Sequence, residues 1–181
     1  MSKIKTTQQV VEHGLTDAVD RNDFLNAMRA VANSVTVVTT DGKAGCHGGT
    51  VSAFCSVSAD PPTVLVCLHG DSHIAETVAE NGSFCVNILP TNNQHASDRF
   101  AGRHDDEVTD RFEGIDLESA ETSDFTAPIL KGSTAFCCEI QEIVNSGTHR
   151  IFIGTVMSVE AGTPDPLLYF DGAYRKMGDA L

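Results

Sequence analysis

The sequence of 181 residues has no long apolar run and few basic residues. Its longest apolar stretch, at residues 63–68, has the length of a strand and is far too short for a membrane-spanning helix. Residues 1–20 are polar and acidic with no apolar centre, so they do not form a secretory signal. Only 12 Lys and Arg accompany 25 Asp and Glu, and the net charge of −13 argues against a nucleic-acid-binding surface. These absences predict a cytoplasmic globular protein that binds neither a membrane nor a nucleic acid.

The sequence also lacks the motifs of common nucleotide-binding and hydrolytic folds. No G-x-G-x-x-G follows a strand and no G-x-x-x-x-G-K-[ST] occurs, which argues against a Rossmann unit and a P-loop. The absence of a G-x-S-x-G elbow disfavours a hydrolase. His69 and His73 stand four residues apart, but no third ligand follows in register, so we expect no metal site.

Six cysteines are spread along the chain, at Cys46, Cys55, Cys67, Cys85, Cys137 and Cys138. In a chain of this length without a signal, buried free thiols are expected rather than disulfides. Adjacent residues of a strand point to opposite faces, so Cys137 and Cys138 cannot easily share chemistry. None of the six has the sequence context of a nucleophile.

Hydrophobic periodicity and turn residues predict one mainly β domain with a few helices at residues 21–181, after a loose extension at 1–20. Helices are expected at 24–32 after an Asp23 cap, from the Ser72 cap to Asn81, and at 92–102. Strands are expected at 35–40, 49–57, 63–68, 83–89, 133–145 and 149–161. A last short strand and turn are expected at 166–174, and an acidic irregular stretch at 103–127. Because the strands follow one another in hairpin-like pairs, an antiparallel barrel is favoured over a doubly wound sheet.

The segment CHGGTVSAFCSVSADPP, at residues 46–62, combines two glycines with alternating apolar and hydroxyl side chains. The hydroxyls belong to Thr50, Ser52, Ser56 and Ser58. Small hydroxyls and backbone N–H groups suit a planar anionic ligand such as a phosphorylated cofactor, because they donate without adding bulk. The alternative is an ordinary edge strand with a glycine-rich turn.

An anionic cofactor would need a locally positive pocket in this acidic chain. Ser72 and the two amides that follow it could receive a phosphate at a helix N-terminus, or Ser72 could be an ordinary N-cap. The acids of 104–124 are interpreted as a solvated loop. The candidate cations are Arg99, Arg103, Lys131, Arg150, Arg175 and Lys176.

A histidine follows a turn in the segment GTHRIFIG, at residues 147–154. His149 would project from the rim of a barrel, either into a site or as a solvated turn residue. Tyr169 and Tyr174 add aromatic hydrogen-bonding groups near the end of the chain.

Together these segments resemble the short-chain flavin reductases, split-barrel proteins that serve as reductase components of two-component flavin monooxygenases. The resemblance runs from about residue 24 to residue 177. It rests on three blocks: 48–68 with Ser72 following, 84–89 with RFAGR at 99–103, and 147–156 with 166–177.

The resemblance implies an antiparallel Greek-key split barrel, a homodimer that holds FMN or FAD at its interface and takes a hydride from NADH or NADPH. The implied flavin-binding residues are Gly49, Thr50, Val51, Ser52, Ser56, Val57, Ser58, Ser72, Phe100, Ala101, Arg103 and Tyr174. Of these, Ser72, Phe100, Ala101 and Arg103 are expected towards the ribityl and phosphate end. His149, the candidate catalytic residue, falls in a block that reads Gly-Asp-His in the family and is associated with the nicotinamide. Here Thr148 replaces the acid, which leaves the preference for NADH or NADPH open.

The implied activity is an NAD(P)H:flavin oxidoreductase whose reduced flavin diffuses to a separate oxygenase. Hydride transfer between two cofactors requires stacking and placement more than a protein acid, base or metal, so the residues agree with this activity. The alternatives are a non-catalytic flavin-binding protein, a pyridoxamine-phosphate-type oxidase on the same barrel, and a purely structural dimer. The sequence does not identify the partner oxygenase, or distinguish a prosthetic flavin from a diffusing one.

Overall fold

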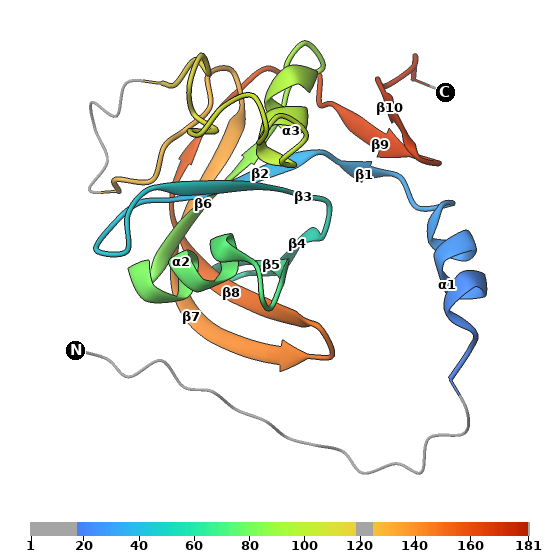
Figure 1. The fold of residues 1–181 in the computed structure, drawn as a ribbon, viewed down its shortest axis with the longest axis horizontal. Coiled ribbons are helices and arrows are strands. Elements are labelled where there is room, and N and C mark those ends of the chain that lie inside the picture. Colours follow the sequence, from blue (N-terminus) through green and yellow to red (C-terminus); the bar gives the residue numbers. More distant parts are fainter. Residues whose placement is uncertain (1–17, 119–124, 181) are drawn as a thin grey trace.

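The computed structural model describes residues 18–118 and 125–180 (Figure 1). Its helices are α1 (Arg21–Met28), α2 (His73–Asn81) and α3 (Gln94–Phe100). Its strands are β1 (Asn33–Ser34), β2 (Thr36–Thr40), β3 (His47–Val51), β4 (Phe54–Ala59), β5 (Pro62–His69), β6 (Ser83–Ile88), β7 (Thr134–Ser146), β8 (His149–Glu160), β9 (Leu168–Phe170) and β10 (Ala173–Arg175). The described chain is therefore mainly β, as the sequence predicts.

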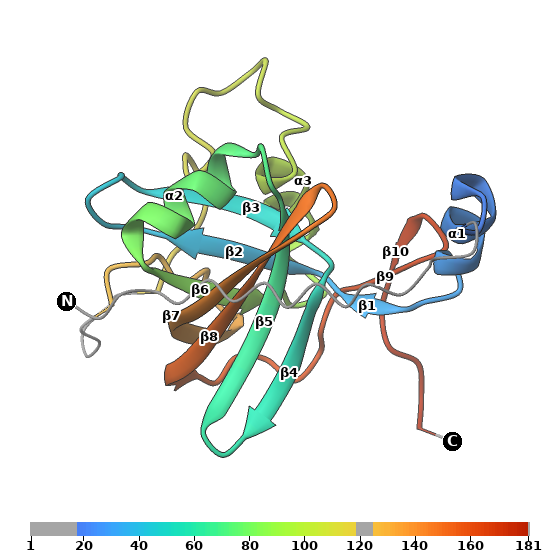
Figure 2. The ribbon, with the colours of Figure 1, turned by 90° about the horizontal axis from the view of Figure 1, so that it is seen from below.

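Seven strands form one antiparallel sheet in the order β3-β2-β6-β7-β8-β5-β4. Strands β3 and β4 lie at its two edges, although only Ser52 and Ala53 separate them along the chain. The two edges therefore come together, and the N–H of Cys67 in β5 donates to the carbonyl of Ala53 at 3.0 Å. Figure 2 shows the sheet curling round to this junction. The predicted antiparallel barrel is confirmed.

The prediction of a single strand at 49–57 is wrong. Strand β3 ends at Val51 and pairs with β2, whereas β4 begins at Phe54 and pairs with β5 on the other edge. The apolar alternation runs on unbroken through Ala53 and Cys55, so the pattern does not reveal the bend. The hydroxyl residues of this segment consequently do not form one row on one strand.

The other predicted strands are confirmed, with differences at their ends. The short strand and turn expected at 166–174 are the first part of the hairpin of β9 and β10, which ends at Arg175. This hairpin joins β1 in a separate three-stranded sheet. The described parts of 103–127 contain no helix or strand, apart from an isolated bridge of Leu117 with Leu130.

Helix α1 begins earlier than predicted. Its cap is Asp20, whose carboxylate accepts from the N–H of Asn22 at 2.8 Å, so the expected Asp23 cap and the range 24–32 are wrong. With the small sheet, α1 forms a lobe beside the barrel in both ribbon views (Figures 1 and 2).

The apolar face of α1 is only partly covered by the described chain. Phe24 and Met28 are 53% and 44% exposed, and no residue of this helix is buried. Helical periodicity indicates that one face is apolar but not what packs against it.

The main core lies between the sheet and α2. Helix α2 buries Ile74, Ala75 and Val78 against strand residues that include Phe84 and Phe152. The helix ends at Gly82, whose φ of 79° is the left-handed conformation of a helix C-terminus. A smaller core beneath α3 includes Phe100, Leu89 and Leu130.

The six cysteines are free thiols, but their burial differs from the prediction. Cys85, Cys137 and Cys138 are buried, whereas Cys46 and Cys55 are exposed. In the part of the chain that the structure describes, no helix is long and apolar enough to cross a membrane.

Candidate active site

A cavity of about 370 Å³ opens where the two edges of the barrel meet. Strand β3 and the bend after it supply Gly49, Thr50, Val51, Ser52 and Ala53. The remaining lining residues are Cys67, Leu68, His69, Ser72, Ile74, Phe100, Ala101, Arg111 and His149. Most of the residues predicted to bind a cofactor are thus brought together from four separate segments.

Strand β3 forms one wall of the cavity and is held rigidly. The hydroxyl of Thr50 donates to the carbonyl of Ser97 in α3 at 2.7 Å. A Cβ on Gly49 would lie 3.2 Å from Ile74 of α2, and one on Gly48 would lie 2.6 Å from the Phe100 ring. The two glycines therefore let both helices pack directly onto β3 and keep side-chain bulk away from the strand.

Ser72 lies beside the cavity at the N-terminus of α2. Its hydroxyl donates to the carbonyl of His69 at 2.6 Å and accepts from the N–H of Ala75 at 3.4 Å. The hydroxyl is therefore the helix N-cap, the simpler of the two sequence interpretations. The N–H groups of His73 and Ile74 have no acceptor within the helix and are the donors that α2 can offer an anion.

His149 stands at the rim of the cavity, directly after the turn that joins β7 to β8. The Oγ1 of Thr148 lies 3.0 Å from its Nδ1, so Thr148 orients the imidazole at the position where the resemblance leads us to expect an acid. Across the strands, His149 is paired in register with His69, and their ring centroids are 5.5 Å apart.

The sequence suggests His69 only as a metal ligand and does not indicate its place beside His149. The two are neighbours because β5 and β8 are antiparallel with this register. Sequence spacing cannot show a register between strands so far apart in the chain.

Arg111 supplies the permanent positive charge among the described residues that line the cavity. Its guanidinium donates to the Asp105 carboxylate at 2.8 and 2.5 Å and to the carbonyl of Phe100 at 3.2 Å. The hydrogen bond with Asp105 raises the pKa of Arg111, and Arg111 holds the pKa of the Asp105 carboxyl below its usual range. Gly102, with a φ of 78°, leaves room for this pair, since a Cβ there would lie 2.8 Å from both side chains.

Arg111 is not among the predicted cations, because it lies in the acidic stretch that is interpreted as a solvated loop. The sequence feature that could have indicated a packed loop here is Phe112, an aromatic residue in a polar run next to Arg111. Phe112 packs edge-on against Phe100 with centroids 4.9 Å apart and so anchors the loop at the cavity. Arg111 also lines an adjoining cavity of about 580 Å³ with His47 and His73.

Ser56, Val57 and Ser58 lie on the β4–β5 hairpin, outside the described lining of the cavity. The Ser58 hydroxyl donates to the carbonyl of Asp60 at 3.0 Å and accepts from its N–H at 3.1 Å, so it stabilises the turn. Val57 is 50% exposed. Within one chain these three residues do not meet the rest of the predicted site.

Arg103 and Tyr174 join β10 to α3 and also lie outside the cavity lining. Arg103 pairs with Asp98 at 2.8 Å, and its guanidinium lies 5.9 Å from the centre of the Tyr174 ring. The Tyr174 hydroxyl donates to Asp98 at 2.7 Å and lies 2.9 Å from the Ser97 Oγ. Arg103 is therefore paired with a carboxylate, as Arg111 is with Asp105, but unlike Arg111 it does not line the cavity.

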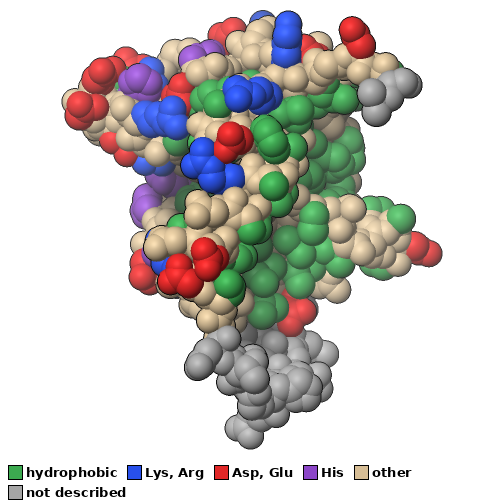
Figure 3. All heavy atoms as spheres, turned by 90° about the vertical axis from the view of Figure 1, so that its right-hand side faces the viewer, with side chains coloured by type: hydrophobic (Ala, Val, Ile, Leu, Met, Phe, Trp, Pro, Cys, Tyr) green, Lys and Arg blue, Asp and Glu red, His purple; other side chains and the backbone are tan. Residues whose placement is uncertain are grey.

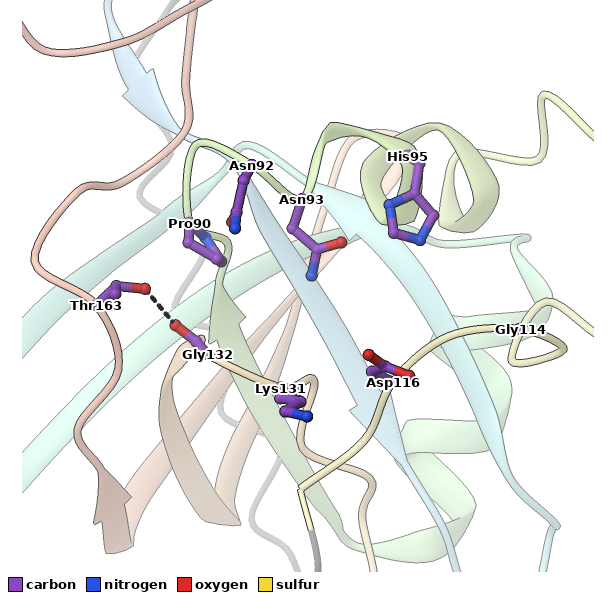
Figure 4. Close-up of a pocket in the computed structure, with 9 residues that line it drawn as sticks. All are labelled: Pro90, Asn92, Asn93, His95, Gly114, Asp116, Lys131, Gly132 and Thr163. Atoms are coloured by element: carbon purple, nitrogen blue, oxygen red, sulfur yellow. Dashed lines mark hydrogen bonds between the residues drawn. The ribbon is translucent and has the colours of Figure 1, made fainter.

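A separate polar cavity of about 440 Å³ lies at the other end of α3 (Figure 4). Figure 4 shows Asn93 and His95 on one side of it and Asp116 and Lys131 on the other. It holds the candidate cation Lys131 but none of the predicted flavin-binding residues in its described lining. The described residues contain no group of three or more His, Cys, Asp or Glu placed to hold a metal ion.

The residues of the first cavity fit a flavin nucleotide. Its volume is within the range of small-molecule sites, and its walls combine apolar side chains with backbone groups and small hydroxyls. Arg111 and the N-terminus of α2 provide positive charge for a phosphate. The paired imidazoles of His69 and His149 border the open side.

Comparison with known proteins agrees with this geometry. Residues 28–178 match the model of the flavin reductase like domain. The chain is 40% identical over 160 residues to the FMN reductase (NADH) RutF of Ancylobacter novellus, an alignment covering 87% of this chain and 86% of the relative. It is 38% identical over 158 residues to the protein of that name from Bradyrhizobium diazoefficiens, covering 86% and 85% of the two chains.

The solved structures that share the fold include the following two. The first is BorF, the flavin reductase component of a bacterial two-component tryptophan halogenase, with a TM-score of 0.78, 31% identity and coverage of 89% of this chain and 100% of that one. The second is a homolog of nitrilotriacetate monooxygenase component B from Mycobacterium thermoresistibile, with a TM-score of 0.78, 30% identity and 87% coverage of each chain. With its family model matched along most of its length, the chain belongs to the flavin reductase like domain family.

Proposed function

We propose that this chain is an NADH-dependent flavin reductase that acts on FMN and supplies reduced flavin to a separate monooxygenase component. The observation that carries the proposal is the single cavity at which β3, the α2 N-terminus, Arg111 and His149 meet. Relatives named FMN reductase (NADH) support the choice of FMN and NADH. Structural neighbours named as reductase components support the delivery of reduced flavin to an oxygenase.

The residues of this chain would hold FMN and NADH in position for hydride transfer. A bound flavin supplies the hydride acceptor of the reaction, so the protein has to provide position rather than an acid or a metal. Gly49 and Ser52 offer backbone groups without bulk, and Arg111 offers a charge partner for phosphate against the net charge of −13. His149, oriented by Thr148, stands at the rim where a nicotinamide nucleotide would enter.

We further propose that the chain works as a homodimer whose interface covers the flavin. Ser52 lines both the flavin cavity and a hollow of about 260 Å³ that contains Leu25, Met28 and Tyr169. The exposed apolar residues of this region are Phe24, Leu25, Met28, Val31, Tyr169 and Phe170. Figure 3, which looks onto this side of the molecule, shows apolar side chains gathered on the surface. A patch of this kind is typical of an interface, and a symmetric one would also allow Ser56 and Ser58 of the partner to approach the site.

We place this activity in the cytoplasm. The six cysteines are free thiols, the state that a reducing compartment maintains. Fractionation of cells that produce the protein tests this location, and recovery in an exported fraction would contradict it.

Steady-state oxidation of NADH tests the proposed function. We expect turnover that requires added FMN, with weaker turnover when NADPH replaces NADH. A flavin-binding protein without enzymatic activity would hold yellow flavin and leave NADH unchanged. Oxygen-dependent consumption of pyridoxamine phosphate, without NADH oxidation, would favour the oxidase instead.

A further inference from the structure

Two buried cysteines outside the flavin cavity face each other across neighbouring strands. Cys85 of β6 and Cys137 of β7 are directly paired in the antiparallel register. Their sulfur atoms are 3.3 Å apart and hydrogen-bonded to each other. Both lie in a small cluster with Ala127 and Ala135, separate from the main core.

We propose that Cys85 and Cys137 are a peroxide-oxidisable dithiol that closes to a disulfide between β6 and β7. Directly paired residues of antiparallel strands have Cα atoms about 4.5 or 5.5 Å apart, and both values lie within the range that a disulfide spans. The sulfur atoms have only to approach each other by rotation of the side chains. The bond therefore forms without any change of strand register.

The two thiols are unequal, as a nucleophile and a resolving group need to be. The pKa of the Cys137 thiol is lowered to about 7, chiefly because the Cys85 thiol donates a hydrogen bond to its thiolate. The same hydrogen bond, followed by burial, raises the pKa of Cys85 well above its usual value. Cys137 is thus the thiol of the pair that ionises more readily, beside a protonated partner.

The oxidant comes from the chemistry of reduced flavin. Dihydroflavin released in air reacts with O₂ to give oxidised flavin and hydrogen peroxide, and this source rests on the proposed function. The Cys137 thiolate attacks one peroxide oxygen, an S–O bond forms, the O–O bond breaks, and the hydroxide that leaves takes a proton to become water. The Cys85 sulfur then attacks the sulfenic acid, the S–S bond forms, and the hydroxyl leaves with the Cys85 proton as a second water.

The neighbouring thiols provide a contrast. Cys138 is on the opposite face of β7, in the main core, where burial raises its pKa to about 12. Burial also raises the pKa of Cys46 to about 11, although this thiol is partly exposed. The reactive pair is covered by Phe125 and Ile129, so peroxide reaches it only through local opening of that cover.

The test is peptide mapping of the intact full-length protein by mass spectrometry without reduction. Reagent hydrogen peroxide added to the protein alone should produce a Cys85–Cys137 linked peptide pair and the loss of two hydrogens from the intact mass. Cys138→Ser should still form the link. Cys85→Ser should instead accumulate a sulfenic acid on Cys137 that dimedone traps, and Cys137→Ser should leave Cys85 unmodified.

A second arm tests the source of the oxidant. Protein turning over NADH and FMN in air should form the same link, and catalase should suppress it. Oxidation confined to Cys46 and Cys55 under reagent peroxide would overturn the dithiol. A link formed with reagent peroxide but not during confirmed NADH oxidation would overturn the flavin-derived source. The absence of NADH oxidation would be a failure of the proposed function, which the first arm does not depend on.

Discussion

Arg111 is the arginine that lines the cavity proposed to bind FMN, and Arg111→Gln should weaken FMN binding. A hydrogen bond to a charged group contributes about 1.5–3 kcal/mol, and partial exposure of this side chain favours the lower value, so we expect a Kd about 10-fold higher. Fluorescence titration of FMN measures the change. Riboflavin, which has no phosphate, should bind both proteins alike.

Arg103→Gln is the matched control for that experiment. Its guanidinium is paired with Asp98 and lies outside the cavity lining, so FMN affinity should change by less than about 2-fold. A larger loss of FMN affinity in Arg103→Gln than in Arg111→Gln would show that the phosphate lies at the other arginine.

Substitution of His149 should weaken the reaction with NADH and leave the affinity for FMN unchanged. His149→Ala removes about one hydrogen bond to a neutral group, which is worth about 0.5–1.5 kcal/mol, so kcat/KM for NADH should fall about 2- to 15-fold. Thr148→Val should show a smaller loss of the same kind, because it removes the hydrogen bond that orients the ring. Stopped-flow reduction of the flavin by NADH measures both, and wild-type rates in His149→Ala would remove this residue from the site.

Substitutions at Ser52 and Ser56 distinguish a flavin site within one chain from a flavin site shared between two chains. Ser52→Tyr should abolish FMN binding with the fold intact, since this bend lines the cavity. Ser56→Tyr should leave binding unchanged in a monomer and weaken it only where the β4 hairpin of a partner reaches the flavin. Fluorescence titration and circular dichroism are the two measurements, and tight FMN binding by Ser52→Tyr would place the ring elsewhere.

Among the elements, β8 depends on a glycine where it crosses the core. A Cβ on Gly154 would lie 2.8 Å from the Phe84 ring and 2.9 Å from the Cys138 Cβ. Gly154→Ala should therefore destabilise the fold by about 1–3 kcal/mol, as overpacking does. Gly178→Ala, with nothing within 4 Å of the added carbon, should change the free energy of unfolding by less than about 0.5 kcal/mol. Equal urea midpoints for the two variants would contradict this packing.

The elements also show what the sequence can predict. The sequence predicts β8 because its apolar residues alternate, and β5 because its apolar run has the length of a strand. It predicts Ser72 as a cap because a helix N-terminus needs a hydrogen-bond acceptor. The sequence does not predict the bend at Ser52. The alternation continues through the bend, although the pairing strand changes there from β2 to β5. The pairing of His69 with His149 was missed for the related reason that register is a property of two strands.

For the candidate site, the segments that line the cavity were predicted better than the arginine that lines it. Gly49 to Ser52, Phe100 and His149 all line the cavity, and the resemblance to the flavin reductases implies each of them. Arg111 reaches the same cavity through a loop without periodic structure, and its placement depends on Asp105 and Gly102. Such placement depends on tertiary contacts that leave no local pattern.

At the scale of the whole molecule, the lobe that carries α1 should form the dimer interface. Leu25→Asp should shift sedimentation from a dimer towards a monomer, because it puts a charge into the apolar face beside the flavin cavity. Leu25 is 42% exposed in the single chain, so the fold itself should be retained. Wild-type protein that sediments as a monomer and reduces FMN at full rate would contradict the shared site.

The most direct test of the central claim is anaerobic mixing of the protein with FMN and NADH while the visible absorbance of the flavin is recorded. We predict bleaching of the flavin with an equal loss of NADH, much faster than in the absence of protein, and no bleaching above background with Ser52→Tyr. Bound flavin that stays oxidised in the presence of excess NADH would contradict the assignment of this chain as a flavin reductase.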